Sequence, residues 1–148
     1  MAQVRSSDAH WEGDLLGGSG RVAAGTSKAF GPLQVTWEAR AQASDTGLTS
    51  PEELLSAAWA ACFAMASSNE LAKAGFPVAS NDVNVSITAD KTDSGWTVLS
   101  AVLRLRASVP NVDDATFRKA VEGAKDGCPI SRALKGNVDL SVEATLEQ

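Results

Sequence analysis

The residues of this chain best suited to covalent or redox chemistry are its two cysteines, Cys62 and Cys128. A cysteine reacts as the thiolate, so the question for each is what would stabilise its negative charge. Two cysteines are too few for the disulfide framework of a small secreted domain, and a chain of 148 residues is long enough to build a core without one. The pair is therefore either inert packing or a redox centre.

Cys128 has the stronger local case for a low pKa. It stands where the N-cap of a short helix would stand, directly before Pro129 and close in sequence to Lys125 and Arg132. Helix N-termini and cations both stabilise a thiolate. The alternative is that Cys128 is a small apolar residue at a turn.

Cys62 lies in the middle of an uncharged run, Leu54–Asn69. A buried thiol usually behaves as a small apolar residue, and burial raises its pKa. A reactive Cys62 would need a cation supplied by the fold, and Arg40, oriented by Glu52, is the candidate. The alternatives are that Arg40 is a solvated charge at a strand end and that Glu52 only complements the helix dipole.

Other chemistries find less support. The glycine cluster at 17–20 lacks the lysine and the following helix of a phosphate-binding loop. A hydrolase using His10 as its base has no evident residue to orient that histidine. A metal site made from Cys62, Cys128 and His10 matches no common ligand spacing. The net charge of −5 and the pI near 4.8 argue against a nucleic-acid-binding surface.

A helix from residue 50 to residue 75 is the element that must position these groups. Ser50 and Glu53 form a capping box at its start, and Gly75 suits a left-handed cap at its end. Because its middle is apolar or small on every side, we expect it to be surrounded by the rest of the protein and partly by a second chain. It is too rich in alanine and serine to indicate a membrane span.

The remaining segments predict strands before this helix and a mixture of strands and helices after it. Residues 1–49 contain short strands, and alternation predicts one over Leu33–Arg40 before a polar loop, Ala41–Thr49. After the central helix, residues 81–148 predict a β-hairpin, two helices and a closing strand: Val83–Ala89, Trp96–Val109, a helix capped by Asp113 or Asp114, a helix starting at Pro129, and Val138–Leu146. This order indicates one α+β domain, 1–148, with a largely antiparallel sheet. The polar start, without an apolar run, predicts a cytoplasmic protein.

Three stretches resemble the osmotically inducible protein C (OsmC) family, which includes the organic hydroperoxide resistance proteins. They are Ser50–Leu55 (SPEELL), Ala60–Ala66 (AACFAMA) and Gly127–Leu134 (GCPISRAL), and Ala9–Asp14 (AHWEGD) resembles the OsmC branch. The resemblance covers nearly the whole chain. It implies an intertwined homodimer in which antiparallel sheets wrap two central buried helices, and a thiol peroxidase that reduces organic hydroperoxides in oxidative and osmotic stress defence. It implies no metal and no organic cofactor, but an external dithiol reductant.

The family pattern also implies roles for four residues. It maps the peroxidatic cysteine onto Cys62, the resolving cysteine onto Cys128, the assisting arginine onto Arg40 and the glutamate onto Glu52, with Arg21 as the alternative arginine. This reverses the local ranking of the two thiols. Burial beside a fixed arginine would organise both the thiolate and the leaving oxygen. The apolar residues flanking Cys62, Trp59, Phe63 and Met65, would suit a bulky apolar peroxide.

The distance between Glu52 and Cys62 along the central helix is too long for the two side chains of one chain to share a site. In one helix Glu52 and Cys62 are separated by about 15 Å along the axis, so two antiparallel helices, one from each subunit, are needed to bring them together. The alternative to an enzyme is a non-catalytic redox sensor or ligand-binding module that uses the same thiols.

Overall fold

The computed structural model describes residues 1–42 and 46–147, and the chain divides into two compact units, Met1–Leu54 and Leu55–Gln148. Within the described residues, none of the helices combines the length and the apolar character needed to cross a membrane.

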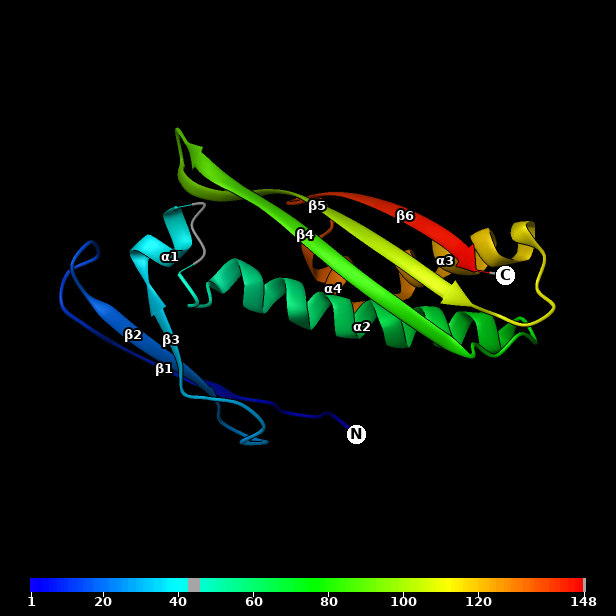
Figure 1. The fold of residues 1–148 in the computed structure, drawn as a ribbon, viewed down its shortest axis with the longest axis horizontal. Helices are drawn as coiled ribbons and strands as arrows, with labels where there is room; N and C mark the ends of the chain where they lie inside the picture. Colours follow the sequence, from blue (N-terminus) through cyan, green and yellow to red (C-terminus); the bar gives the residue numbers. More distant parts are fainter. Residues whose placement is uncertain (43–45, 148) are drawn as a thin grey trace. The chain divides into compact units, whose positions relative to one another are not determined.

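The first unit is a three-stranded antiparallel sheet followed by a short helix. Its strands are β1 (Ser7–Glu12), β2 (Ser19–Ala24) and β3 (Leu33–Thr36), in the order β1-β2-β3 (Figure 1). The two outer strands pass close to Gly20 of β2, where a Cβ atom would lie only 2.6 Å from the carbonyl oxygen of His10 and 2.7 Å from the Trp11 ring. Only glycine fits there without a shift of its neighbours.

The predicted strand over Leu33–Arg40 is wrong in its second half. Helix α1 (Trp37–Ala41) begins directly after β3, because the Thr36 hydroxyl accepts a hydrogen bond from the Ala39 amide at 3.1 Å and caps the helix. Arg40 therefore stands in the last turn of a helix and not at the end of a strand. Part of the predicted loop 41–49, residues 43–45, lies outside the described residues.

The predicted Ser50 cap and the left-handed Gly75 are confirmed in α2 (Pro51–Lys73). The Glu53 amide donates to the Ser50 hydroxyl at 3.1 Å, and the Glu53 carboxylate accepts a hydrogen bond from the Thr49 hydroxyl at 2.6 Å. At the other end Gly75 has a φ of +90°, and the Phe76 amide donates to the Leu71 carbonyl at 2.9 Å. These bonds satisfy backbone groups that a helix end otherwise leaves without partners.

Burial along α2 within this one chain is one-sided, and the expected cover by a second chain stays a prediction. Its buried residues form one stripe with a spacing of four: Trp59, Phe63, Ser67 and Leu71. Several apolar or small residues of the same helix are exposed in this chain, including Ala57, Ala58, Ala61, Met65 and Ala72. Within the second unit one side of the helix is buried, because this unit has one sheet and packs one face of it against the helices.

The second unit is a mixed sheet with helices on one face. Strands β4 (Ser80–Thr92) and β5 (Gly95–Ser108) form the predicted antiparallel hairpin, and β6 (Asp139–Glu147) lies parallel to β5 (Figure 1). The largely antiparallel sheet is thus interrupted at β6. Between β5 and β6 the chain passes through α3 (Asp114–Gly127) and α4 (Pro129–Leu134), and such a helical crossover returns a strand in the parallel direction.

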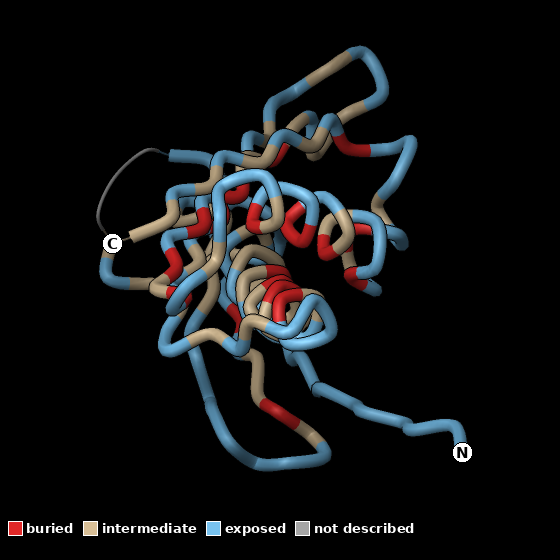
Figure 2. The backbone as a smooth tube through the Cα atoms, turned by 90° about the vertical axis from the view of Figure 1, so that its right-hand side faces the viewer, coloured by how far each residue is buried: buried red, intermediate tan, exposed pale blue. Residues whose placement is uncertain are grey.

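The core lies between this sheet and its helices. Alternation along β5 buries Leu103 and Leu105, while Arg104 on the opposite face pairs with Glu143 at 3.0 Å. The predicted inner stripe of α3 is confirmed, and it is fully or nearly fully buried: Phe117, Ala120, Val121 and Ala124. Figure 2 shows these buried positions as red segments, in contrast to the exposed N-terminal stretch. Helix α3 is therefore anchored in the core, and α4 begins directly after it.

Candidate active site

The two cysteines meet in the second unit. Cys62 from α2 and Cys128 from the start of α4 place their sulfur atoms 3.3 Å apart, and neither forms a disulfide. Cys62 is partly exposed, whereas Cys128 is fully buried. The structure thus brings together two predicted site residues that are 66 positions apart in sequence.

The backbone between two helices fixes Cys128. Its amide donates to the Ala124 carbonyl at 2.8 Å and so closes α3, and its carbonyl accepts from the Arg132 amide at 3.0 Å and so opens α4. Pro129 occupies the first turn of α4, where its missing N–H costs no hydrogen bond. Because both helices hold this residue, its sulfur has little freedom to move.

The pKa of Cys128 is lowered. Burial alone would raise it, but the amide and hydroxyl of Ser131, the Cys62 thiol and the Ile130 amide together outweigh burial by stabilising the thiolate. The Cys128 side chain makes no capping hydrogen bond, although the residue is the N-cap of α4. The lowered pKa agrees with the prediction that the helix N-terminus makes Cys128 acidic. Lys125 and Arg132, the cations named in that prediction, line a pocket that does not include Cys128.

The pKa of Cys62 is raised. Burial is the main cause, the Ile130 amide opposes it, and the neighbouring Cys128 adds to it. When both thiols are protonated, Cys128 donates to Cys62. When Cys128 has lost its proton, Cys62 becomes the donor, which stabilises the Cys128 thiolate at the expense of Cys62. Within this chain Cys128 is the more acidic thiol and Cys62 the more accessible one.

Cys62 opens onto a pocket of about 400 Å³. The residues around this opening come from α2, α3 and the start of α4: Cys62, Met65, Ala66, Asn69, Glu70, Lys73, Ala124, Gly127 and Pro129. Of the three apolar neighbours predicted to flank Cys62, only Met65 lines the pocket, because Trp59 and Phe63 point into the core. The rim is polar, with Lys73 bound to Glu70 at 2.8 Å.

Arg40 and Glu52 form a close ion pair in the first unit. The Nε and Nη2 atoms of Arg40 donate to the same carboxylate oxygen of Glu52 at 3.0 and 2.8 Å. The guanidinium also lies 5.9 Å from the centre of the Trp37 ring. Next to the pair is a mostly apolar pocket of about 340 Å³ lined by Trp11, Leu15, Val35, Thr36, Trp37, Arg40 and Pro51. Glu52 thus fixes an arginine whose head faces an apolar wall.

Arg21, the alternative arginine, lies elsewhere in this unit. It is exposed on β2 opposite His10 and Gln34. Its charge helps to lower the pKa of Glu12, although the hydrogen bond from His10 to that carboxylate is the larger cause. Among the residues that the structure describes, no group of three or more His, Cys, Asp or Glu side chains could hold a metal ion. Of the two arginines, Arg40 is the one bound to Glu52.

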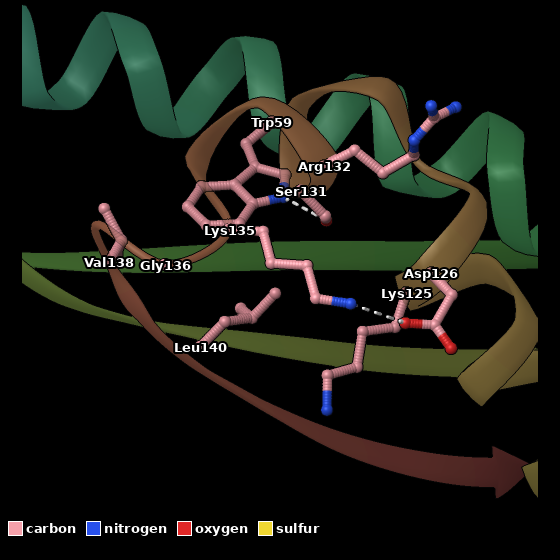
Figure 3. Close-up of a pocket in the computed structure, with 9 residues that line it drawn as sticks. All are labelled: Trp59, Lys125, Asp126, Ser131, Arg132, Lys135, Gly136, Val138 and Leu140. Carbon is pink, nitrogen blue, oxygen red and sulfur yellow. Dashed lines mark hydrogen bonds and ion pairs between the residues drawn. The ribbon is translucent and has the colours of Figure 1, made fainter.

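Sequence reasoning missed one contact beside the thiols, because it treated Trp59 only as an apolar neighbour of Cys62 and gave Ser131 no role. The indole Nε1 of Trp59 donates to the Ser131 hydroxyl at 2.8 Å, and both side chains are buried (Figure 3). Ser131 stands three residues after the N-cap Cys128, the spacing of a capping box, in which each side chain can reach the backbone amide of the other residue. That spacing was a readable signal for Ser131, whereas nothing in the sequence links it to Trp59, 72 positions away.

Comparison with known proteins agrees with this architecture. Residues 43–143 match the family described as OsmC-like protein. The chain is 37% identical to the peroxiredoxin OsmC of Escherichia coli over 144 residues, which cover 97% of this chain and 98% of that one. It is 30% identical to the organic hydroperoxide resistance protein OhrB of Bacillus subtilis over 96 residues, 64% of this chain and 68% of that one.

Solved structures share the fold. A crystal structure of an organic hydroperoxide resistance protein from Elizabethkingia anophelis has a TM-score of 0.75 at 21% identity and covers 99% of this chain and 100% of that chain. One of an organic hydroperoxide resistance protein OsmC from Legionella pneumophila has a TM-score of 0.71 at 21% identity, with 98% of each chain covered. With the full-length similarity in sequence and the family match over residues 43–143, these findings show that the chain belongs to the OsmC-like protein family.

Proposed function

We propose that this protein is a two-cysteine peroxidase that reduces organic hydroperoxides to alcohols. The observation that carries the proposal is the pair of reduced sulfurs 3.3 Å apart, one of them open to a pocket. The names of its relatives, peroxiredoxin and organic hydroperoxide resistance protein, support a peroxide-related redox role.

The reaction has three steps. The Cys62 thiolate attacks one peroxide oxygen, the O–O bond breaks, and the leaving alkoxide takes a proton to become the alcohol while Cys62 becomes a sulfenic acid. The Cys128 thiolate then attacks the Cys62 sulfur, hydroxide leaves and is protonated to water, and a disulfide forms. An external dithiol reduces this disulfide by exchange and is itself oxidised.

Accessibility, more than acidity, supports Cys62 as the thiol that meets peroxide. Cys62 lines a pocket, whereas Cys128 is fully buried behind it. Arg40, held by Glu52, would supply the positive charge that favours the Cys62 thiolate and the developing alkoxide. The lowered pKa of Cys128 suits the second step, because its thiolate is available to attack the sulfenic acid without a separate base.

The apolar pocket beside Arg40 supports an organic substrate. Trp11 and Leu15 are exposed large side chains on this wall, and Trp37 faces the guanidinium. An alkyl or aryl group would be desolvated there while the peroxide group lay at the arginine. Hydrogen peroxide has no group for that wall.

A homodimer with shared sites is part of the proposal. The exposed small and apolar residues of α2 offer a face that a second α2 could cover, including Ala58, Ala61 and Met65. Since Glu52 and Cys62 stand about 15 Å apart along one helix axis, an antiparallel partner helix would bring Glu52 of one subunit to Cys62 of the other. Two-fold symmetry would then create two equivalent sites.

Refolded mixtures of two inactive variants test the shared site. Cys62→Ser subunits combined with Glu52→Ala subunits should regain activity in heterodimers, because one site then contains both native residues. Heterodimers that form but show no activity above the parents would place each site within one chain. A monomer in sedimentation would reject the dimer.

Steady-state peroxide consumption tests the function itself, with a panel of peroxides and of dithiols. We expect turnover with at least one dithiol and a faster reaction with a bulky organic hydroperoxide than with hydrogen peroxide. Equal rates for both peroxides would remove the argument from the apolar pocket. A disulfide that forms once but turns over slowly with every reductant would favour a redox sensor.

The cytoplasmic location remains a prediction.

A further inference from the structure

The two sulfurs of the site are close enough to bind one atom between them. The Sγ atoms of Cys62 and Cys128 lie 3.3 Å apart, and both thiols are free. Two backbone hydrogen bonds fix Cys128 at the junction of α3 and α4, and Cys62 lies in the middle of α2. Because packed helices set the separation of the sulfurs, it decides which kind of atom can bind both.

The angle at a shared atom follows from this separation. With two bonds of about 2.3 Å, the length of a zinc–sulfur bond, sulfurs 3.3 Å apart form an angle of about 90° at the bound atom. A linear ion such as Cu(I) would need the sulfurs about 4.6 Å apart, and a tetrahedral ion such as Zn²⁺ about 3.8 Å. The reduced pair therefore fits a soft centre whose bonds stand nearly at right angles.

Trivalent arsenic is a centre of this kind. It lies in the same period as zinc, binds soft sulfur ligands, and forms three bonds that stand nearly at right angles. Two sulfurs and one carbon substituent complete these bonds, so no third protein ligand is needed. A structural Zn²⁺ site needs four ligands, and the part of the chain that the structure describes has no group of three or more His, Cys, Asp or Glu side chains that could hold a metal ion.

The pocket at Cys62 has room for the third substituent. It measures about 400 Å³, and inside its polar rim the walls are apolar or small: Met65, Ala66, Ala124, Gly127 and Pro129. Cys128 is fully buried behind Cys62, so an arsenical reaches the pair from the Cys62 side. A phenyl or short alkyl group on the arsenic would lie against these walls, which favour it over the hydroxyl group of arsenite.

We propose that Cys62 and Cys128 form a chelating site for trivalent organoarsenicals that carry one organic substituent. In the reaction both S–H bonds of the protein and both As–OH bonds of the hydrated arsenical break, two As–S bonds form, and each thiol proton leaves with a hydroxide as water. Arsenic stays trivalent, so no oxidant or reductant takes part. The inference does not rest on the proposed function, although bound arsenic would block both thiols of a peroxidase.

Titration of the reduced protein with phenylarsine oxide tests the site. One equivalent should consume both free thiols in a colorimetric thiol assay, and the intact mass should show one phenylarsenic group per chain. Excess mercaptoethanol should leave the adduct in place, whereas dimercaptopropanol, itself a dithiol, should remove it. Loss of only one thiol per equivalent, two arsenicals per chain, or release by the monothiol would overturn the proposal.

The two single-thiol variants measure the contribution of chelation. Cys62→Ser and Cys128→Ser should each bind phenylarsine oxide about a hundredfold more weakly than the parent, because joining two binding groups in one site raises affinity by about that factor or more. An affinity equal to that of the parent in either variant would refute chelation. The parent protein with its disulfide already formed is the matched control that needs no substitution, and binding to it would contradict a site made of thiols.

Comparison of phenylarsine oxide with arsenite tests the pocket. Free dithiothreitol serves as the reference, because its preference between the two compounds reflects the arsenic chemistry alone. Beyond that reference, the protein should prefer the phenyl compound about tenfold, as expected for partial burial of a ring. A preference equal to that of dithiothreitol would refute the role of the pocket.

None of these measurements uses peroxide. A protein that chelates the arsenical but does not turn over any peroxide would refute the proposed function and leave this site standing. An active peroxidase whose two thiols bind arsenic separately would have the opposite meaning.

Discussion

Replacement of Arg40 separates a catalytic role from a structural one. Its guanidinium makes two hydrogen bonds to one oxygen of Glu52, with side chains 31% and 13% exposed. It lies in the last turn of a five-residue helix that buries no residue. Arg40→Ala should therefore remove a fixed positive group without leaving a cavity in the core.

The expected magnitudes differ for stability and for rate. A hydrogen bond to a charged group contributes about 1.5–3 kcal/mol when it is well shielded. Because Arg40 is about a third exposed, solvent screening reduces this, and we expect the free energy of unfolding to fall by about 1 kcal/mol. Loss of a preorganised group that stabilises a developing oxyanion lowers a rate by roughly a hundredfold or more. The rate constant for Cys62 oxidation should thus fall about a hundredfold.

Stopped-flow oxidation of Cys62 by cumene hydroperoxide, together with denaturant unfolding of the same samples, measures both quantities. Arg40→Lys is the matched variant, since it keeps the charge but not the planar group that binds Glu52 through two nitrogens. Its rate constant for Cys62 oxidation should lie between those of the parent protein and Arg40→Ala. If Arg40→Ala reacts within about threefold of the parent while Arg21→Ala is slow, the arginine has been wrongly chosen. If the unfolding curve shows that most of the Arg40→Ala protein is unfolded under the assay conditions, and the folded fraction accounts for the lost rate, the catalytic role is refuted.

Cys62→Ser should abolish peroxidase activity, whereas Cys128→Ser should still undergo one oxidation at Cys62. Mass spectrometry after one equivalent of peroxide tests this. A sulfenic acid on Cys128 of the parent protein, beside an unmodified Cys62, would reverse the two roles. The lowered pKa of Cys128 makes the reduced protein gain stability as the pH rises from that pKa toward the ordinary thiol value of 9.0, and the raised pKa of Cys62 makes it lose stability above 9.0. Denaturant unfolding of the reduced protein minus that of the disulfide form should therefore peak near this value, and a flat difference would contradict the two shifts. Gly20→Ala should destabilise the protein by about 1–3 kcal/mol, because a Cβ would overlap β1, while the adjacent exposed Ser19→Ala should cost much less; equal unfolding midpoints would refute the close approach.

Local patterns predicted most of the elements. The capping box of α2, the left-handed Gly75, the hairpin of β4 and β5 and the inner stripe of α3 each depend on residues within a few positions of one another. The short helix α1 was missed because Thr36 suits both a strand and an N-cap, and only the Ala39 hydrogen bond distinguishes them. The direction of β6 was missed because a period of two is the same in a parallel and an antiparallel pair.

In the candidate site too, features that depend on neighbouring residues were predictable, and features that depend on contacts distant in sequence were not. The acidity of Cys128 was predictable because its cause, the start of α4, is next to it in sequence. The approach of Cys62 was not, since it depends on packing across 66 residues, and only the family resemblance implied it. Ser131 carried a readable signal, but the donor that holds it is on another helix.

The two opposite pKa shifts are consistent with the proposed order of steps. With one proton between two sulfurs 3.3 Å apart, the pair carries a single negative charge, and the surroundings of each sulfur decide which one holds it. The donors at the start of α4 draw the charge to Cys128, so a cation at Cys62 is needed to draw it back for attack on peroxide. Once Cys62 is a sulfenic acid, it no longer competes for the charge, and the same donors of α4 supply the Cys128 thiolate that the second step requires. Under this mechanism Arg40 governs the first step, so Arg40→Ala should slow the oxidation of Cys62 and leave the rate constant for the attack of Cys128 on the sulfenic acid unchanged.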